Sequence, residues 1–254
     1  MGRTKSKDRC PRCVLRRTLC ICALIPALPT RTRLVVVMHW LETRTTTNTG
    51  RLATLAIPLS EIRLRGQPQV LDACQGVVVP ERIPLLLFPT EDATELTPEF
   101  VASLDRPADL IVPDGTWKQA SKVHYREPSL AGIRKVKLPP GPPSQYKLRI
   151  APRPEAVSTF EAIARAFGIL EGPQEGPRIQ AELERVFRLM VERTLWSRGR
   201  IQAADTEFGI SQEAFDDREG TLVRPAFVQA ATGLKDGSAE PAQDWTLPPG
   251  WVKR

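Results

Sequence analysis

Four of the five cysteines lie within thirteen residues, in the stretch CPRCVLRRTLCIC. Cys10 and Cys13 have the C-x-x-C spacing of a zinc knuckle, and Cys20 and Cys22 form a tighter C-x-C pair. Four thiolates complete a tetrahedral shell, so the predicted ion is a structural Zn²⁺ and not a catalytic one. Two disulfides or an iron–sulfur cluster are the alternatives for the same residues. Cys74 stands apart and is interpreted as a core or surface thiol.

A second candidate for chemistry is the acid in LIVPDGTWKQASK, residues 110–122. Asp114 follows a run of aliphatic residues, and a carboxylate at the exit of a strand can act as a general base. An Asp before a Gly is also a common turn former, which is the structural alternative. Trp117 could stack on a nucleobase or pack in the core.

Several common catalytic motifs are absent from the sequence. There is no G-x-G-x-x-G and no G-x-x-x-x-G-K-[ST], so neither the usual dinucleotide fingerprint nor a P-loop is present. There is no H-E-x-x-H, and the two histidines, His39 and His124, are not spaced as a metal pair.

Apolar runs of strand length alternate with helical patterns along the chain. The predicted strands are residues 34–40, 85–88, 110–113 and 133–138, with a further candidate at 146–150. The predicted helices are residues 48–62, with Asn48 as N-cap and a break at Pro58, then 96–104, 116–125, 158–172 and 178–196. Ser158 and Glu161 have the spacing of a capping box at the start of the helix at 158–172. This alternation predicts an α/β fold with a mostly parallel sheet flanked by helices.

Ligands of open α/β sheets bind at the carboxyl ends of the strands. Three predicted strand exits are polar or carry proline: LLLFPTED at 85–92, LIVPDGTW at 110–117 and LRIAPRPEAVST at 148–159. We therefore expect the active site to be built from these three segments.

Positive charge is concentrated in two regions. Residues 1–66 carry 13 Lys and Arg against 3 Asp and Glu, and residues 118–153 carry nine basic residues and one acid, Glu127. Such clustering indicates contact with a polyanion, RNA or DNA being the common case, although solvated surface is the alternative.

The remaining composition is that of a globular protein, with 41% hydrophobic and 26% charged residues. No apolar run reaches the roughly 18–20 residues that span a bilayer, and the basic N-terminus lacks the apolar stretch of a secretory signal. The chain is predicted to be cytoplasmic, with no membrane contact. The predicted domains are a zinc knuckle and connector at 1–30, a catalytic domain at 31–200 and a loosely structured C-terminal extension at 201–254.

Six blocks, taken together, resemble the DTW-domain family. They occur in family order and cover residues 10–170, about two thirds of the chain: CPRCVLRRTLCIC, TRTRLVVVMHWLETRTTTNTGRLA, LLLFPTEDA, LIVPDGTWKQASK, SQYKLRIAP and STFEAIARAF. The resemblance implies a tRNA-uridine aminocarboxypropyltransferase, which moves the 3-amino-3-carboxypropyl group of S-adenosylmethionine to N3 of a uridine and releases methylthioadenosine. It also implies kinship with SPOUT-type knotted methyltransferases.

The resemblance also implies roles for individual residues. Asp114 would be catalytic by accepting the N3 proton, with Thr116, Trp117, Asn48 and Arg51 around the substrate. The residues expected to bind the S-adenosylmethionine co-substrate are Phe88, Pro89, Pro113, Leu148, Arg149, Ser158 and Thr159. The residues expected to contact RNA are Lys118, Lys122, Arg126, Arg16 and Arg17.

Two other functions fit the same sequence. One is a SPOUT-type RNA methyltransferase that uses the same cofactor, and the other is a non-enzymatic zinc-knuckle RNA-binding protein. The expected partner is tRNA, and no DNA is expected. The sequence leaves open which uridine is modified and what the oligomeric state is.

Overall fold

The structure is a computed structural model that describes residues 8–148 and 155–218. The chain divides into two compact units, one formed by residues 22–188 and one that joins residues 1–21 to residues 189–254. The larger unit holds the sheet and the strand exits at residues 88–92 and 114–117. The domain limits predicted from the sequence stay a prediction.

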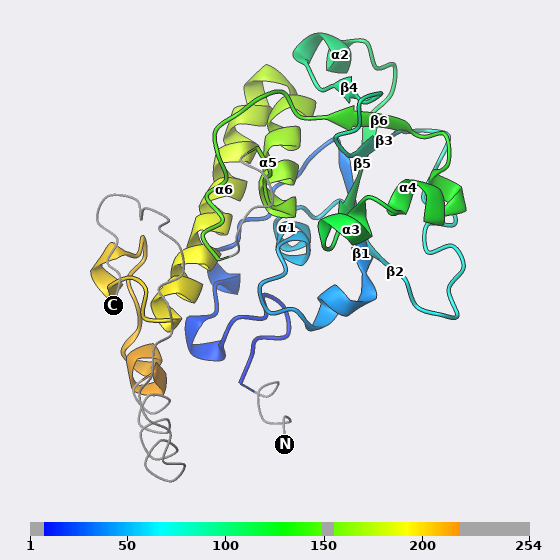
Figure 1. Ribbon diagram of the computed structural model, residues 1–254. Helices are drawn as coiled ribbons and strands as arrows, with labels where there is room; N and C mark the ends of the chain where they lie inside the picture. Colours follow the sequence, from blue (N-terminus) through cyan, green and yellow to red (C-terminus); the bar gives the residue numbers. More distant parts are fainter. Residues whose placement is uncertain (1–7, 149–154, 219–254) are drawn as a thin grey trace. The chain divides into compact units, whose positions relative to one another are not determined.

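The larger unit is built on a six-stranded sheet with the strand order β2-β1-β5-β3-β6-β4 (Figure 1). All of its strand pairs are parallel, which confirms the predicted parallel sheet. The strands are β1 (Arg33–His39), β2 (Ser60–Arg65), β3 (Ile83–Leu87), β4 (Thr94–Glu95), β5 (Ala108–Asp114) and β6 (Arg134–Lys137). All seven residues of β5 are buried, as expected for an apolar strand inside a parallel sheet.

Helices cover both faces of this sheet (Figure 1). The helices of the described chain are α1 (Gly50–Ala56), α2 (Pro98–Ala102), α3 (Trp117–Ala120), α4 (Val123–Arg126), α5 (Thr159–Leu170) and α6 (Gly172–Ser197), with short 3₁₀ turns between them. The residues of α6 from 189 onward belong to the smaller unit. On one face, Val35, Val37 and Ile111 pack with Val123 of α4 in a buried cluster. Because side chains alternate along a strand, Asp114 belongs to the opposite face, where α1 and α5 pack.

The helix predicted over residues 48–62 is partly wrong. α1 begins at Gly50 with Thr49 as its N-cap, so the N-cap predicted at Asn48 is wrong by one residue. The helix ends at Ala56, and the chain then enters strand β2, which the sequence analysis missed. Pro58 stops the helix because it cannot donate the next backbone hydrogen bond. The sequence SEIRLR of β2 carries three charged residues and lies at the edge of the sheet, so it lacks the apolar signature of the inner strands.

Two other predictions also change. The helix predicted over residues 116–125 is divided into α3 and α4, with Lys122 between them in a helical conformation. The strand suggested at 146–150 is absent from residues 146–148, and its last two residues lie outside the described part of the chain. The strand predicted at 133–138 is confirmed as β6.

The smaller unit is described over residues 8–21 and 189–218. Trp196 is 1% exposed, contacts Phe215 edge-on at 5.1 Å between ring centroids, and lies under the Arg218 guanidinium. Most of the C-terminal extension predicted to be loosely structured lies outside the described residues. No helix within residues 8–148 and 155–218 combines the length and apolarity needed to cross a membrane. The cytoplasmic location stays a prediction.

Candidate active site and cysteine cluster

Asp114 is the last residue of β5 and lies at the carboxyl edge of the sheet. Its side chain is almost completely buried, with 4% of the residue exposed. Asn48 Nδ2 donates a hydrogen bond to Asp114 Oδ2 at 2.5 Å, and Thr159 Oγ1 donates one to Asp114 Oδ1 at 2.7 Å. The carboxylate therefore joins three segments that are far apart in the sequence.

The segment before α1 is shaped to hold this carboxylate. Asn48 accepts the Arg51 backbone N–H with its other amide atom, Oδ1, at 3.0 Å, so the side chain is fixed at both ends. Gly50 passes so close that a Cβ atom there would lie 2.8 Å from Asp114 Cγ. A side chain at position 50 would displace the carboxylate, so only glycine fits at this position without moving Asp114.

The start of α5 forms the other side of the site. Ser158 is the N-cap and makes a complete capping box with Glu161, as the sequence predicted. Glu161 also accepts hydrogen bonds from Ser144 Oγ at 2.7 Å and from the Gln145 backbone N–H at 2.6 Å. One buried acid thus attaches the segment around residue 145 to the N-terminus of α5, where the Thr159 hydroxyl donates its hydrogen bond to Asp114.

The second group of site residues is aromatic. Thr116 caps α3 in a capping box with Gln119, and this turn presents Trp117 with 44% of its surface exposed. The Trp117 ring lies 6.2 Å from the ring of Phe88, which follows β3. An exposed tryptophan at a strand exit is not a core residue, so the packing alternative for Trp117 is excluded.

The other predicted co-substrate residues are placed less tightly. Pro89 is exposed after β3, Pro113 is buried within β5, and Leu148 is half-buried at the limit of the described chain. Arg149 lies outside the described residues. Arg51 is half-buried in the first turn of α1, and no ion pair involves it among the residues that the structure describes.

The predicted RNA contacts fall into two sets. Lys118 and Arg126 are exposed on α3 and α4, and Lys122 is half-exposed between them. Arg16 and Arg17 belong to the smaller unit, where Arg16 Nη1 forms an ion pair with Asp217 at 3.0 Å. Arg16 is therefore already engaged with an acid of its own unit.

His39 ends β1 at the same edge of the sheet, and its backbone continues into a 3₁₀ turn. Its Nδ1 accepts the Leu41 backbone N–H at 3.3 Å. Burial lowers the pKa of His39 below its usual value, and the positive charge of Arg65 lowers it further. The imidazole is therefore held in its neutral form near pH 7.

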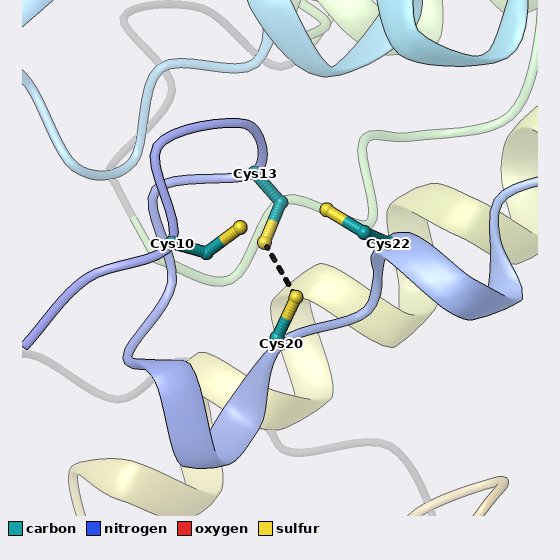
Figure 2. Close-up of side chains that lie close together, drawn as sticks. All are labelled: Cys10, Cys13, Cys20 and Cys22. Atoms are coloured by element: carbon teal, nitrogen blue, oxygen red, sulfur yellow. Dashed lines mark hydrogen bonds between the residues drawn. The ribbon is translucent and has the colours of Figure 1, made fainter.

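The four N-terminal cysteines converge on one point, as Figure 2 shows. Their sulfur atoms all lie within 4.8 Å of one another, and the Cys13 and Cys20 sulfurs are 3.7 Å apart. A tetrahedral ion with Zn–S bonds of ~2.3 Å needs sulfurs about 3.8 Å apart, so this donor set fits such an ion. All five cysteines are thiols, so the disulfide alternative is wrong for this structure.

The loop between the first two cysteines is a tight turn. The Val14 backbone N–H donates to the Cys10 carbonyl at 3.0 Å, and the Cys10 N–H donates to the Leu15 carbonyl at 2.8 Å. Val14 has a φ of 56°, which is unusual for a β-branched residue. The turn therefore imposes a strained backbone on Val14 in order to direct Cys10 and Cys13 to the same side.

Sequence reasoning missed two kinds of site residue. Gly50 lies in one of the six family-like sequence blocks. Its close approach to Asp114 depends on the packing of α1 against β5, which the spacing of residues in the sequence does not reveal. The sequence identified Glu161 only as half of a capping box. Its hydrogen bonds to Ser144 and Gln145 were not predicted. Thr159 was assigned to the co-substrate, and that role stays a prediction; its hydrogen bond to Asp114 was not expected from the sequence.

The fold and site define an α/β protein with a parallel sheet, a buried carboxylate at its carboxyl edge and a four-thiol cluster that could hold a metal ion. A family model described as the DTW domain matches residues 7–195. The chain belongs to the DTW-domain family, as its sequence blocks predicted.

Comparison with known proteins finds relatives of moderate similarity. The tRNA-uridine aminocarboxypropyltransferase 2 of Macaca fascicularis is 28% identical over 172 residues, which cover 66% of this chain and 58% of the relative. The protein of the same name from Mus musculus is 28% identical over 170 residues, covering 65% and 57%. This chain therefore spans less than two thirds of the length of these curated relatives.

One solved structure is also similar. It is the SAM-dependent rRNA:acp-transferase Tsr3 from Vulcanisaeta distributa, with 19% sequence identity and a TM-score of 0.37. The match covers 76% of this chain and 97% of that chain. A TM-score of this size does not establish a shared fold, so the knotted SPOUT-type topology stays a prediction.

Proposed function

We propose that this protein transfers the 3-amino-3-carboxypropyl group of S-adenosylmethionine to N3 of a uridine in tRNA and releases methylthioadenosine. Family membership and the names of the relatives support the reaction class. The observation that carries the proposal is Asp114, fixed at the carboxyl edge of the sheet by Asn48 and Thr159. That edge is where open α/β sheets bind their ligands.

S-adenosylmethionine supplies a sulfonium leaving group and the carbon that N3 attacks. Uridine N3 carries a proton that must leave as the N3–C bond forms and the C–S bond breaks, with the bonding pair going to sulfur. We assign Asp114 as the acceptor of that proton. Positioning and proton removal are then the main contributions of this chain to the rate.

The other site residues have matching roles in this proposal. Arg51, at the start of α1, carries a positive charge that suits the carboxylate of the transferred group. Phe88 and Trp117 offer aromatic faces to a flat ring, and the other residues assigned to the co-substrate are Pro89, Pro113, Leu148, Arg149, Ser158 and Thr159. Lys118, Lys122 and Arg126 hold the RNA backbone.

The test is nucleoside mass spectrometry of bulk tRNA incubated with S-adenosylmethionine and the protein. We expect a new uridine derivative heavier by one aminocarboxypropyl group, absent with Asp114→Asn and present with the exposed control Asp105→Asn. A derivative heavier by one methyl group would make the protein a methyltransferase. If the folded protein binds tRNA and yields no derivative, the proposal is wrong and a binding function takes its place.

We also infer that the ion held by Cys10, Cys13, Cys20 and Cys22 is zinc in a structural role. Four thiolates close the coordination shell and leave no position for substrate. Elemental analysis of the purified protein should find one zinc per chain. Stoichiometric iron together with sulfide would instead support the iron–sulfur alternative.

A further inference from the structure

A chain of aromatic rings runs along one side of the larger unit. The Phe88 ring lies 6.2 Å from Trp117 and 6.4 Å from His124, and His124 meets Tyr125 edge-on at 5.1 Å. The rings at the two ends are open to solvent, because Trp117 is 44% exposed and Tyr125 is 61% exposed. The aromatic chain therefore connects the strand exit at Asp114 with a surface farther along α4.

Tyr125 borders a hollow of about 500 Å³. Its lining also includes Asp92, His124 and residues 130–135. This volume lies within the ~300–1,000 Å³ of sites that bind small molecules, so a single nucleotide can be accommodated. Lys135 forms an ion pair with Asp92 at 3.1 Å, so the negative charge of Asp92 is compensated within the hollow.

The charge around these rings is strongly positive. Residues 118–137 contain six Lys and Arg and a single acid, Glu127. Glu127 is 4% exposed and its charge is compensated by Arg65 at 2.8 Å, so it adds little negative potential at the surface. In the part of the chain that the structure describes, no ion pair involves Lys118, Lys122 or Arg126. These three cations flank the exposed Trp117 and Tyr125 rings.

Cations interleaved with exposed aromatic rings are the chemistry that binds single-stranded nucleic acid. The cations attract the backbone, and each ring offers a face on which an unpaired base can stack. A base inside an A-form duplex cannot reach such a ring, because its faces are already stacked. An acidic peptide would be attracted by the same charge but would leave the two exposed rings without a role.

We propose that the hollow beside Tyr125 binds an unpaired nucleotide adjacent to the target uridine, with its base stacked on Tyr125 and its backbone along Lys122 and Arg126. The inference rests on the proposed function in that the substrate is RNA. It adds that recognition extends from Trp117 to Tyr125.

Fluorescence anisotropy of a labelled single-stranded RNA oligonucleotide, measured on the full chain without S-adenosylmethionine, tests this inference. Tyr125→Ala should weaken binding roughly 5- to 100-fold, because it removes one stacking platform. Tyr125→Phe keeps the ring and should bind as the wild type does. Phe208→Ala, which removes a 49% exposed ring in the smaller unit, is the matched control and should change nothing.

Salt dependence separates stacking from backbone contact. The slope of log affinity against log salt should stay unchanged in Tyr125→Ala, because the lost contact carries no charge. The same slope, which is negative, should become less steep by about 0.7 in Arg126→Gln, where one phosphate contact to a single strand is removed.

Three outcomes would overturn the inference: no binding of the single strand by the wild type, equal binding of the same sequence as a duplex, or a Tyr125→Ala variant that binds like the wild type. Failure of the proposed function would look different. Binding that depends on Tyr125 without any transfer product would refute the transferase and leave the subsite standing. Transfer with unchanged kcat and KM in Tyr125→Ala would refute the subsite and leave the transferase standing.

Discussion

Strand β5 carries a buried aspartate near each end, and the two are held in different ways. Asp109, near the amino end, is 1% exposed and forms ion pairs with Arg33 and Arg82. Asp114, at the carboxyl end, is 4% exposed and is bonded to Asn48 and Thr159, which stand at the starts of helices. Asp109 thus links β5 to arginines at the amino end of the sheet. Asp114 links the carboxyl end of β5 to the segments where α1 and α5 begin.

This difference indicates that Asp109 serves the stability of the fold and Asp114 serves the reaction. Arginines at the amino end of the sheet neutralise Asp109 where no ligand of an open α/β sheet is expected. The carboxyl end places Asp114 among segments that can be varied without changing the sheet. We therefore expect Asp109 to contribute to the free energy of folding and Asp114 to contribute to the rate of transfer.

The largest expected effect on stability comes from Asp109→Asn. The substitution removes the acid that pairs with Arg82 and the nearer of two acids that pair with Arg33, which keeps Glu61 at 3.8 Å. We expect a loss of about 2–4 kcal/mol in the free energy of unfolding. The transfer rate per folded molecule should remain within about two-fold of the wild type. Denaturant unfolding followed by fluorescence measures the first quantity. A stability loss below about 0.5 kcal/mol would remove the distinction between the two aspartates.

Gly50→Ala should disturb the carboxyl end directly. The added Cβ would lie 2.8 Å from Asp114 Cγ, so the carboxylate or the start of α1 must shift. Overpacking of this kind costs about 1–3 kcal/mol, and the displaced carboxylate should also slow transfer. Unfolding and product formation are measured on the same preparation. Wild-type values for both would show that the close approach to Asp114 has no consequence.

Thr159→Val sharpens the comparison further, because valine keeps the shape and removes the hydroxyl that donates to Asp114. A stability loss of about 1 kcal/mol is expected, together with slower transfer. Thr159→Ser retains the donor and should restore most of the rate. A valine variant as active as the wild type would mean that this hydrogen bond does not position Asp114 for transfer.

The smallest expected effect is a pH dependence at the carboxyl end. The pKa of His39 is lowered in the folded protein by burial and by Arg65, so the unfolded chain binds its proton more readily. Stability should therefore fall as the pH drops below the usual histidine pKa of about 6.5. His39→Gln should flatten this part of the stability curve. An unchanged curve in the variant would assign the pH dependence to other groups.

The sequence predicted those features that local patterns encode. The inner strands, the cap of α5 and the convergence of four cysteines follow from apolar runs, capping-box spacing and C-x-x-C chemistry. Strand β2 was not predicted, because SEIRLR is a charged edge strand without a continuous apolar run. The hydrogen bonds of Asp114 to Asn48 and Thr159 were not predicted, because they join residues 66 and 45 positions apart in the sequence. Such contacts depend on how the sheet and its helices are assembled.

The central claim is tested most directly by comparing Asp114→Asn with Asp109→Asn in a single-turnover transfer assay on tRNA, with each rate corrected for the fraction folded. The account predicts a loss of roughly 10²- to 10⁴-fold in Asp114→Asn, the usual contribution of a general base, and little change in Asp109→Asn. Equal rates in the two variants would contradict it and would give Asp114 a structural role like that of Asp109.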